Sequence, residues 1–307
     1  MTPEQKRFEA VLKERLAERA RLLIGADQKV VGLLRDALSQ ITAQLASQPA
    51  EWQQWHLTRL RDQISTVLVA TGQKAGAETD LALRDAWQQG EDLVDKPLAA
   101  AGHAVEMRLT ALDARVLSAM RTFGHERLNN VAAEALGKIG QQLGLVTIGS
   151  VTPFQAIKAV QALLESDSTR RATTIVRTEV SRAFAVASKE RLVQAAPLVP
   201  GLGKQWRRSG KIHSRWTHDL MDGQVVDAGE SFKVPNPGGG IDLMQCPHDP
   251  KAPPEQVINC GCLAIPYLKS WKVATPGAKP FTELELKLDA RKAALDKAAK
   301  DAGRRQE

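Results

Sequence analysis

Aromatic side chains are scarce in this sequence: they make up 4% of its residues, and there is a single tyrosine. This scarcity argues against an all-β sandwich and favours helices that pack through Ala, Leu and Val. The sequence also lacks any apolar run of about 18 residues, so we expect no membrane-spanning segment. The N-terminal stretch MTPEQKRFEAVLKERLAERA is charged and has no apolar core of the kind found in signal peptides, which predicts a cytosolic product.

Cysteine is nearly absent as well. All three cysteines of the 307 residues lie in one short stretch, QCPHDPKAPPEQVINCGC, which begins at Gln245. A reducing cytosol disfavours a disulfide framework, so metal binding is the better expectation for clustered cysteines.

Acidic residues are outnumbered: 42 Lys and Arg face 35 Asp and Glu, which gives a net charge of +7 and a pI near 9.4. This excess favours polyanions or acidic protein surfaces as partners. The surplus is divided about equally between the two sides of residue 200, so it is a mild bias and not a basic tail.

The first part of the chain, residues 1–195, reads as a helical arm or bundle. Apolar residues recur at helical spacing near the start, and Leu34, Leu38, Ile41 and Leu45 repeat the pattern further on. A later helix has clear punctuation in GSVTPFQAIKAVQALLES, where Thr152 fits the N-cap and Gln155 completes a capping box.

The pattern changes at AAPLVPGLG, residues 195–203, where two prolines and two glycines end the helical run. We expect a second, α+β and loop-rich domain over residues 196–275. Short strands are predicted at KQWRRS, at Val225 and Val226 after a turn at Asp222-Gly223, at SFKVP and at CLAIPYL. Few apolar residues are available for its core, so a cross-link of some kind would help to hold it together.

The last part, residues 276–307, reads as a terminal helix or tail. Thr282 and Glu285 form a second capping-box pattern. The helix is rich in Ala and Lys and only weakly amphipathic, so we expect it to become ordered against a partner. Taken together, the three parts predict an α+β protein.

Clustered soft ligands make a structural zinc site the first interpretation of the Cys-rich stretch. Two cysteines separated by one residue place both sulfurs on the same face of an extended segment. Zinc takes four Cys or His ligands, and the candidates here are Cys260, Cys262, His218, Cys246 and His248. Two alternatives stay open: a disulfide between Cys246 and one of the other two, and buried reduced cysteines that act as small apolar residues.

Two further interpretations concern the residues before this stretch. His213, His218 and Asp222 could supply a base and its orienting carboxylate for a zinc-dependent hydrolase. The sequence has no helix-borne H-E-x-x-H, no G-x-S-x-G and no phosphate-binding glycine loop, so we expect no enzymatic activity.

Nucleic acid is the other candidate ligand of this region. The densest basic stretch has Trp206 and Trp216 interleaved and contains Arg207, Arg208, Lys211 and Arg215. Such a stretch can follow phosphates without reading sequence. The alternative is a solvated strand and turn with ordinary tryptophan packing.

The order of these elements resembles a known family. RTEVSRAFAVASKERL is followed by a proline-rich break, by W-x8-R-x2-H-x3-DG-x-VV, by SFKVP and by P-x-DP-x4-E-x2-INC-x-C. This order is similar to that of the phage Mu protein F-like minor head proteins, the head morphogenesis proteins of tailed phages, over residues 170–268. The matching positions are Arg177, Thr178, Glu179, Trp206, Arg215, His218, Asp222, Gly223, Phe232, Pro247, Asp249, Pro250, Glu255, Asn259, Cys260 and Cys262.

Two departures from the family pattern stand out. Gly261 occupies a position that is often basic in the family, and Cys246 and His248 stand where non-ligand residues are expected. A metal site that used them would be particular to this protein.

The resemblance implies a minor capsid protein that is made in the host cytoplasm and resides in the virion, inside the capsid at the portal vertex. Its implied partners are the portal protein, the major capsid or scaffolding protein, and packaged double-stranded DNA. It implies a role in assembly, packaging or ejection; the zinc-dependent hydrolase of nucleic acid or peptidoglycan, with His218 and Asp222 at its centre, is the alternative.

Overall fold

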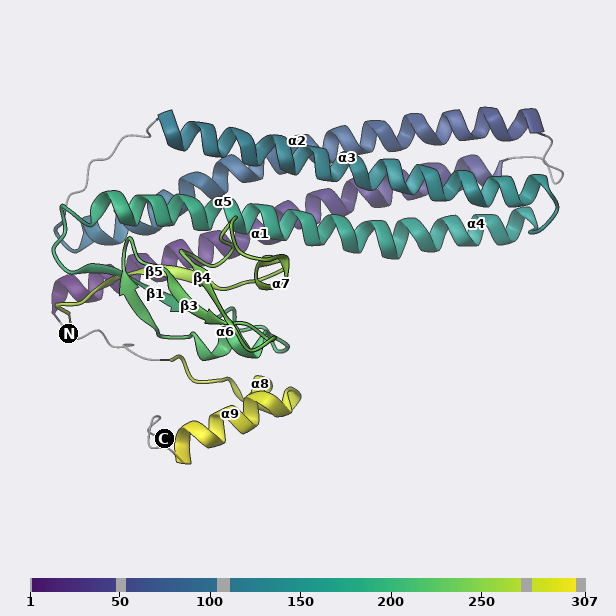
Figure 1. The fold of residues 1–307 in the computed structure, drawn as a ribbon. Helices are drawn as coiled ribbons and strands as arrows, with labels where there is room; N and C mark the ends of the chain where they lie inside the picture. The colour runs from purple at the N-terminus through teal and green to yellow at the C-terminus, as the bar shows by residue number, and fades with distance from the viewer. Residues whose placement is uncertain (1, 48–53, 104–110, 272–277, 302–307) are drawn as a thin grey trace. The chain divides into compact units, whose positions relative to one another are not determined.

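Long helices form the front of the chain, and small antiparallel sheets with two short terminal helices follow, so the fold is α+β as the sequence predicts (Figure 1). The computed structural model describes residues 2–47, 54–103, 111–271 and 278–301. Within these ranges no helix combines the length and the apolarity that crossing a membrane requires. The helices of the front are α1 (Pro3–Ala46), α2 (Gln54–Ala100), α3 (Ala111–Thr147), α4 (Pro153–Ala162), the π-helical turn Leu163–Ser168, and α5 (Thr169–Ala195).

Helix starts that the sequence predicts from local chemistry are confirmed. The hydroxyl of Thr152 accepts a hydrogen bond from the backbone N–H of Gln155, and the Gln155 side chain accepts from the backbone N–H of Thr152. Thr282 and Glu285 form the same reciprocal pair at the start of α8 (Glu283–Leu288). Both capping boxes satisfy N–H groups that have no partner within their helix.

The chain folds into two compact units whose limits differ from the division by sequence pattern. Unit 2 comprises Ala20–Asp85 and Ala111–Val180, whereas unit 1 comprises Met1–Arg19, Ala86–Thr110 and Ser181–Glu307. Helices α1, α2 and α5 therefore each contribute residues to both units. The proline- and glycine-rich segment that begins at residue 195 separates the long helices from the strands. The limits of the two compact units lie elsewhere in the chain.

Unit 2 is a helical bundle with an aliphatic core. Ile41 and Leu45, from the stripe noted in the sequence, are buried in it. Two residues of the sequence pattern that begins RTEVSRAF form ion pairs in this unit. Arg177 donates to Asp27 at 2.6 Å, and the buried carboxylate of Glu179 accepts from Arg127 at 3.2 Å. The remaining core members come from α2, α3, α4 and the π-helical turn, and they are Leu57, Leu60, Ile64, Leu68, Ala135, Ile139, Leu143, Val160 and Leu164.

Two small sheets form what we call the strand module, residues 202–268 of unit 1. In the first sheet β1 (Leu202–Arg207) lies between β2 (Val225–Asp227) and β5 (Leu263–Leu268), and both neighbours run antiparallel to it. In the second sheet β3 (Phe232–Pro235) pairs with β4 (Ile241–Met244).

The two sheets share one core. Trp206 from β1 packs edge-on against Phe232 from β3, with ring centroids 5.2 Å apart. The sequence analysis did not predict strand β4. Its apolar residues Ile241 and Leu243 point outward and are 64% and 65% exposed, so the strand does not show the usual pattern of apolar residues on the buried face. The other core members are Met221, Val234, Met244, Val257, Cys260, Cys262 and Ala264.

The start of α1 and the end of α2 are held within unit 1 by specific contacts. Phe8 packs edge-on against Trp271, at 5.3 Å between ring centroids. Gly90 allows α2 and α5 to approach closely, because a Cβ atom at this position would lie 2.4 Å from the backbone oxygen of Phe184. Unit 1 therefore combines helical residues from the front of the chain with the strand module.

The terminal helix makes contacts within its own chain, and the expectation that it becomes ordered against a partner stays a prediction. Of residues 276–307, the structure describes 278–301, which form α8 and α9 (Ala290–Asp301) with a break at Asp289. Glu285 is 2% exposed and is bound by Arg208 of the strand module and by Lys292 of α9. The guanidinium carbon of Arg208 lies over the ring of Phe281, 4.4 Å from the ring centre. These contacts anchor the helix to its own chain.

Candidate metal centre

Three predicted ligands come together in the strand module. His218 lies in the short helix α6 (Trp216–Leu220), and Cys260 and Cys262 lie in the segment between α7 (Pro254–Val257) and β5. His218 Nδ1 is 3.4 Å from the sulfur of Cys260 and 3.6 Å from that of Cys262. The three ligand atoms lie within 4.8 Å of one another, and all three side chains are buried. This cluster could hold a metal ion.

The neighbours of His218 fix which ring nitrogen faces the sulfurs as an acceptor. His218 Nε2 is 2.8 Å from Oε1 of Gln256. The amide nitrogen of Gln256 donates to the Asp242 carboxylate at 2.7 Å and to the Pro235 carbonyl at 3.2 Å, and neither of these groups can donate in return. The Gln256 oxygen must therefore accept the Nε2 proton, which leaves Nδ1 with a lone pair directed at the two sulfurs. This is the tautomer that a metal-binding histidine needs.

His248 lies beside Cys260, but among the described residues its ring nitrogens are not among the ligand atoms close enough to share one ion; it is the remaining predicted ligand in this region. It is fully buried, and within the described part of the chain neither of its ring nitrogens has a hydrogen-bond partner. Its backbone has φ of +64°, a left-handed conformation that costs free energy for a residue other than glycine. A buried imidazole in this state is destabilising unless something binds it.

The electrostatics of the cysteine pair favour a thiolate at Cys260. The pKa of Cys260 is held well below its usual value because the Cys262 thiol donates to its sulfur and because His248 lies beside it; burial acts in the opposite direction. The pKa of Cys262 is raised well above its usual value by the same contact with Cys260 and by burial. Thiolate is the form in which cysteine binds a metal.

Arg19 of α1 contributes a positive charge to the same region. Burial lowers the pKa of Arg19 to about 10, while interactions with Cys260 and Cys262 act in the opposite direction. Its guanidinium donates to Ser181 Oγ at 3.1 Å and lies 5.1 Å from the ring centre of Phe184. The cysteine pair thus has a buried cation nearby, supplied by a helix from the start of the chain.

The turn that carries the two cysteines is held by basic side chains. Lys211 Nζ donates to the Asn259 carbonyl at 2.5 Å, and Arg215 donates to the Ile258 carbonyl at 2.6 Å. Asn259 has a φ of +52°, which asparagine tolerates better than most residues. A Cβ atom on Gly261 would lie 2.7 Å from Cβ of Ser209, so glycine at this position permits close packing.

Cys246 does not join the cluster. Among the described residues, the group of ligand atoms close enough to share one ion contains His218, Cys260 and Cys262 only. Burial raises the pKa of Cys246 to about 12, and the charged groups around it include Asp249, Lys189 and Lys204. The sequence placed Cys246 among the ligands because it is near Cys260 along the chain, but the fold directs it to a different part of the module.

Two of the four basic residues predicted to bind nucleic acid are engaged inside the module. The side chain of Arg208 is 3% exposed and bonds to Glu285, and that of Arg207 is 15% exposed and lies 3.8 Å from Asp222. Lys211 and Arg215 lie at the surface beside the cysteine turn. The basic stretch is therefore divided between an internal ion-pair network and an exposed edge.

The hydrolase alternative expects Asp222 to orient a catalytic histidine, but the carboxylate of Asp222 has other partners in the structure. Its carboxylate accepts from the backbone N–H groups of Arg208, at 2.9 Å, and of Lys279, at 2.5 Å. It therefore joins the end of β1 to the segment before α8, whereas His218 is oriented by Gln256.

Gln256 and Arg19 are the two residues of this site that the sequence did not indicate. Glutamine has no ligand chemistry of its own, and Arg19 lies far from the cysteines along the chain, so no spacing rule identifies either one. No protein-family model, curated protein or solved structure matches this chain.

Proposed function

We propose that this chain is a minor capsid protein of a tailed-phage head that acts in head assembly, and that its strand module is an interaction module stabilised by a structural zinc ion. The observation that supports this proposal is the position of the later part of the pattern: its residues from Trp206 to Cys262 lie in the strand module, which contains the His218, Cys260 and Cys262 cluster. Residues of a shared pattern that maintain a framework favour a structural role over a catalytic one.

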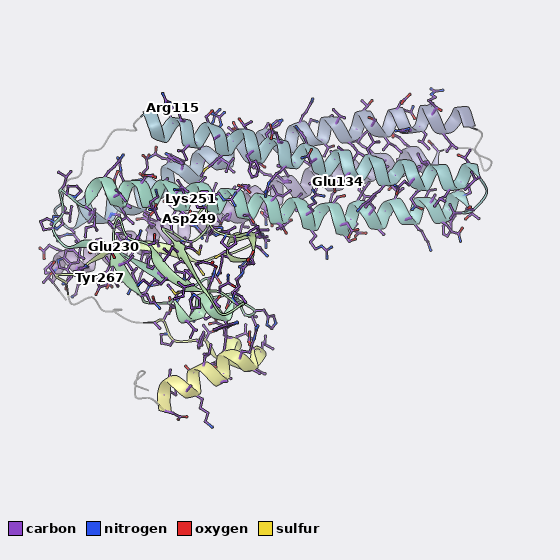
Figure 2. The ribbon with its side chains drawn as sticks, in the orientation of Figure 1. Arg115, Glu134, Glu230, Asp249, Lys251 and Tyr267 are labelled. Atoms are coloured by element: carbon purple, nitrogen blue, oxygen red, sulfur yellow. The ribbon has the colours of Figure 1, made fainter. Side chains whose placement is uncertain are left out.

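The contacts of individual pattern residues support a framework role. Trp206 packs edge-on against His218, with ring centroids 5.3 Å apart, and so links the sheet to the cluster. Asp249, labelled with Lys251 in Figure 2, accepts from the backbone N–H groups of Gln245 at 2.7 Å and Lys251 at 2.9 Å. These bonds fix the loop that carries His248. Arg215 fixes the turn that carries the cysteines.

A four-ligand zinc site is the form of metal binding that this donor set fits best. Cys260, Cys262 and His218 supply three ligands, and His248 is a buried imidazole that needs a partner. Two thiolates and two imidazoles form a common structural zinc set, in which no position is left open for a substrate. When bound, zinc would cross-link the loop after β4, helix α6 and the segment before β5. The module's small core makes such a cross-link valuable.

Metal analysis tests the ligand set. We expect the purified chain to hold one zinc ion per molecule, and a cobalt-substituted sample to show the charge-transfer bands of two thiolates. His248→Ala should weaken zinc binding at least about a hundredfold, because loss of a ligand costs more than loss of a supporting group. Cys246→Ala is the matched control: this side chain is equally buried and should leave zinc affinity unchanged. Unchanged affinity in His248→Ala, with a water on the metal, would favour the hydrolase alternative.

The association with phage heads rests on the resemblance and on the physical character of the chain. A long helical part suits docking on other helical proteins, with the portal protein as the expected partner and the major capsid or scaffolding protein as further candidates. The net charge of +7 suits an environment filled with double-stranded DNA. No catalytic step is required of the protein in this role.

Protein composition of assembled particles tests this part of the proposal. In a phage or prophage that encodes this chain, we expect mass spectrometry of purified procapsids and heads to detect it in few copies. It should co-purify with the portal protein when the two are co-expressed. Particles assembled with portal that lack the chain, while infected cells contain it in soluble form, would contradict a role in the head.

A further inference from the structure

A cleft lies beside the cysteine turn of the strand module. Its volume is about 510 Å³. Ser209, Lys211 and residues 213–218 line one part of it, while residues 258–262 line another. Arg291 of α9 also contributes to the lining. All of these residues belong to unit 1, so the cleft lies within a single compact unit. Its volume is within the range of pockets that bind small molecules or single monomers of a polymer.

Positive charge dominates the lining. The lining contains three cationic side chains, those of Lys211, Arg215 and Arg291, and one carboxylate, that of Glu255. Arg215 bonds to a backbone carbonyl, which leaves its charge in place, and Arg291 is 63% exposed although it lies 3.6 Å from the nearby Asp289. The cleft is therefore suited to an anion.

Apolar and aromatic surface accompanies this charge. Trp216 is 41% exposed and Ile258 is also 41% exposed, and both line the cleft. A large aromatic ring that stays partly in water next to a group of cations is the combination found in proteins that bind single-stranded nucleic acid, where bases stack on the ring and cations follow the backbone. Trp206, the other tryptophan of the basic stretch, is fully buried in the module core.

We propose that this cleft binds a single-stranded segment of nucleic acid, with phosphates at Lys211, Arg215 and Arg291 and a base stacked on Trp216. The volume favours a single strand, because a pocket of this size accepts about one or two nucleotides and excludes a stacked duplex. An acidic peptide would meet the charges but would leave Trp216 without an equivalent flat partner. The inference rests on the cleft alone and does not depend on a role in phage heads.

This site differs from the basic stretch that the sequence suggested. Arg207 and Arg208 are replaced by Arg291, which comes from α9 and reaches the cleft because α8 is anchored to the strand module. The proposed site is therefore a defined cleft and not the whole basic stretch.

Fluorescence anisotropy with a labelled 12-nucleotide oligothymidylate tests the proposal on the full-length chain as purified. We expect the single strand to bind at least about tenfold more tightly than a 12-base-pair duplex. Trp216→Ala should weaken binding about tenfold, and Trp216→Phe should restore most of it, because a phenyl ring still stacks. Arg291→Gln should reduce the slope of log affinity against log salt by about 0.7, the value for one phosphate contact on a single strand.

The controls separate this site from general attraction to a basic protein. Lys251→Gln removes one exposed charge from the strand module outside the cleft lining and should leave affinity for the oligonucleotide unchanged. Zinc content and far-UV circular dichroism verify that each variant is folded. Equal affinity for strand and duplex, or insensitivity to Trp216→Ala in a folded variant, would overturn the proposal. Displacement of the oligonucleotide by polyglutamate at equal charge concentration would assign the cleft to acidic peptides instead.

Discussion

Replacing Cys260 and Cys262 together by serine is expected to abolish zinc binding and to unfold the strand module while unit 2 stays folded. Both side chains are part of the module core, at 6% and 2% exposure. The variant loses the metal cross-link and places hydroxyl groups among apolar neighbours. Structural zinc contributes on the order of 10 kcal/mol to the folding of small domains, so the loss should exceed the stability of a module of this size.

Hydrogen exchange measures this effect by region. We expect β1 and β5 to lose protection, together with the parts of α1 and α5 that belong to unit 1, while the buried core of unit 2 keeps its protection. Cys246→Ser is the control, because it buries a hydroxyl at a similar depth without removing a ligand. Full protection of β1 and β5 in the double serine variant would show that the cluster does not stabilise the module.

Glu285→Gln is expected to release α8 and α9 from the strand module. The Glu285 carboxylate lies between Arg208 and Lys292, and the side chains of all three are 3% exposed or less. Neutralising it leaves two buried cations without their shared counter-ion, which costs about 3–5 kcal/mol. Hydrogen exchange of the α8 amides should rise steeply. Glu283→Gln is the matched control, since Glu283 is exposed on the same helix.

Acid should reproduce the effect of Glu285→Gln. Burial raises the pKa of Glu285, but hydrogen bonds from Arg208, Lys292 and the backbone of Thr282 outweigh it and lower the pKa to about 2. Because the folded pKa is lower than the ordinary value of 4.5, the stabilisation is complete above pH 4.5 and is lost as the pH falls from there toward 2. Protection of α8 that did not change between pH 6 and pH 3 would contradict this anchor.

Local features of the fold were predictable from the sequence. The capping boxes at Thr152 and Thr282 each form between two residues three positions apart, so both interacting residues can be recognised in a short stretch of sequence. The strands around Trp206 and Val225 were predicted from short β-type segments and from the turn at Asp222-Gly223. Strand β4 was missed because a hairpin strand with outward-facing Ile241 and Leu243 shows no buried alternation.

Long-range features were not predictable in the same way. Residue types identified five possible metal ligands, but which of them come together depends on the fold: among the described residues His218, Cys260 and Cys262 form the cluster, and Cys246 and His248 are not part of it. Arg208 looked like a surface cation because its partner Glu285 lies 77 residues away along the chain. The orientation of His218 depends on Gln256, whose own amide is fixed by Asp242. None of these pairings leaves a periodic signal.

The participation of Arg19 in unit 1 has a consequence for synthesis on the ribosome. Its hydrogen-bond partner Ser181 lies 162 residues later. At translation rates of about 5–20 residues per second, this partner is added roughly 10–30 s after Arg19. Unit 2 can complete its bundle once Val180 has emerged, whereas the first nineteen residues must wait for the strand module. The order of translation therefore favours folding of the middle of the chain before its beginning.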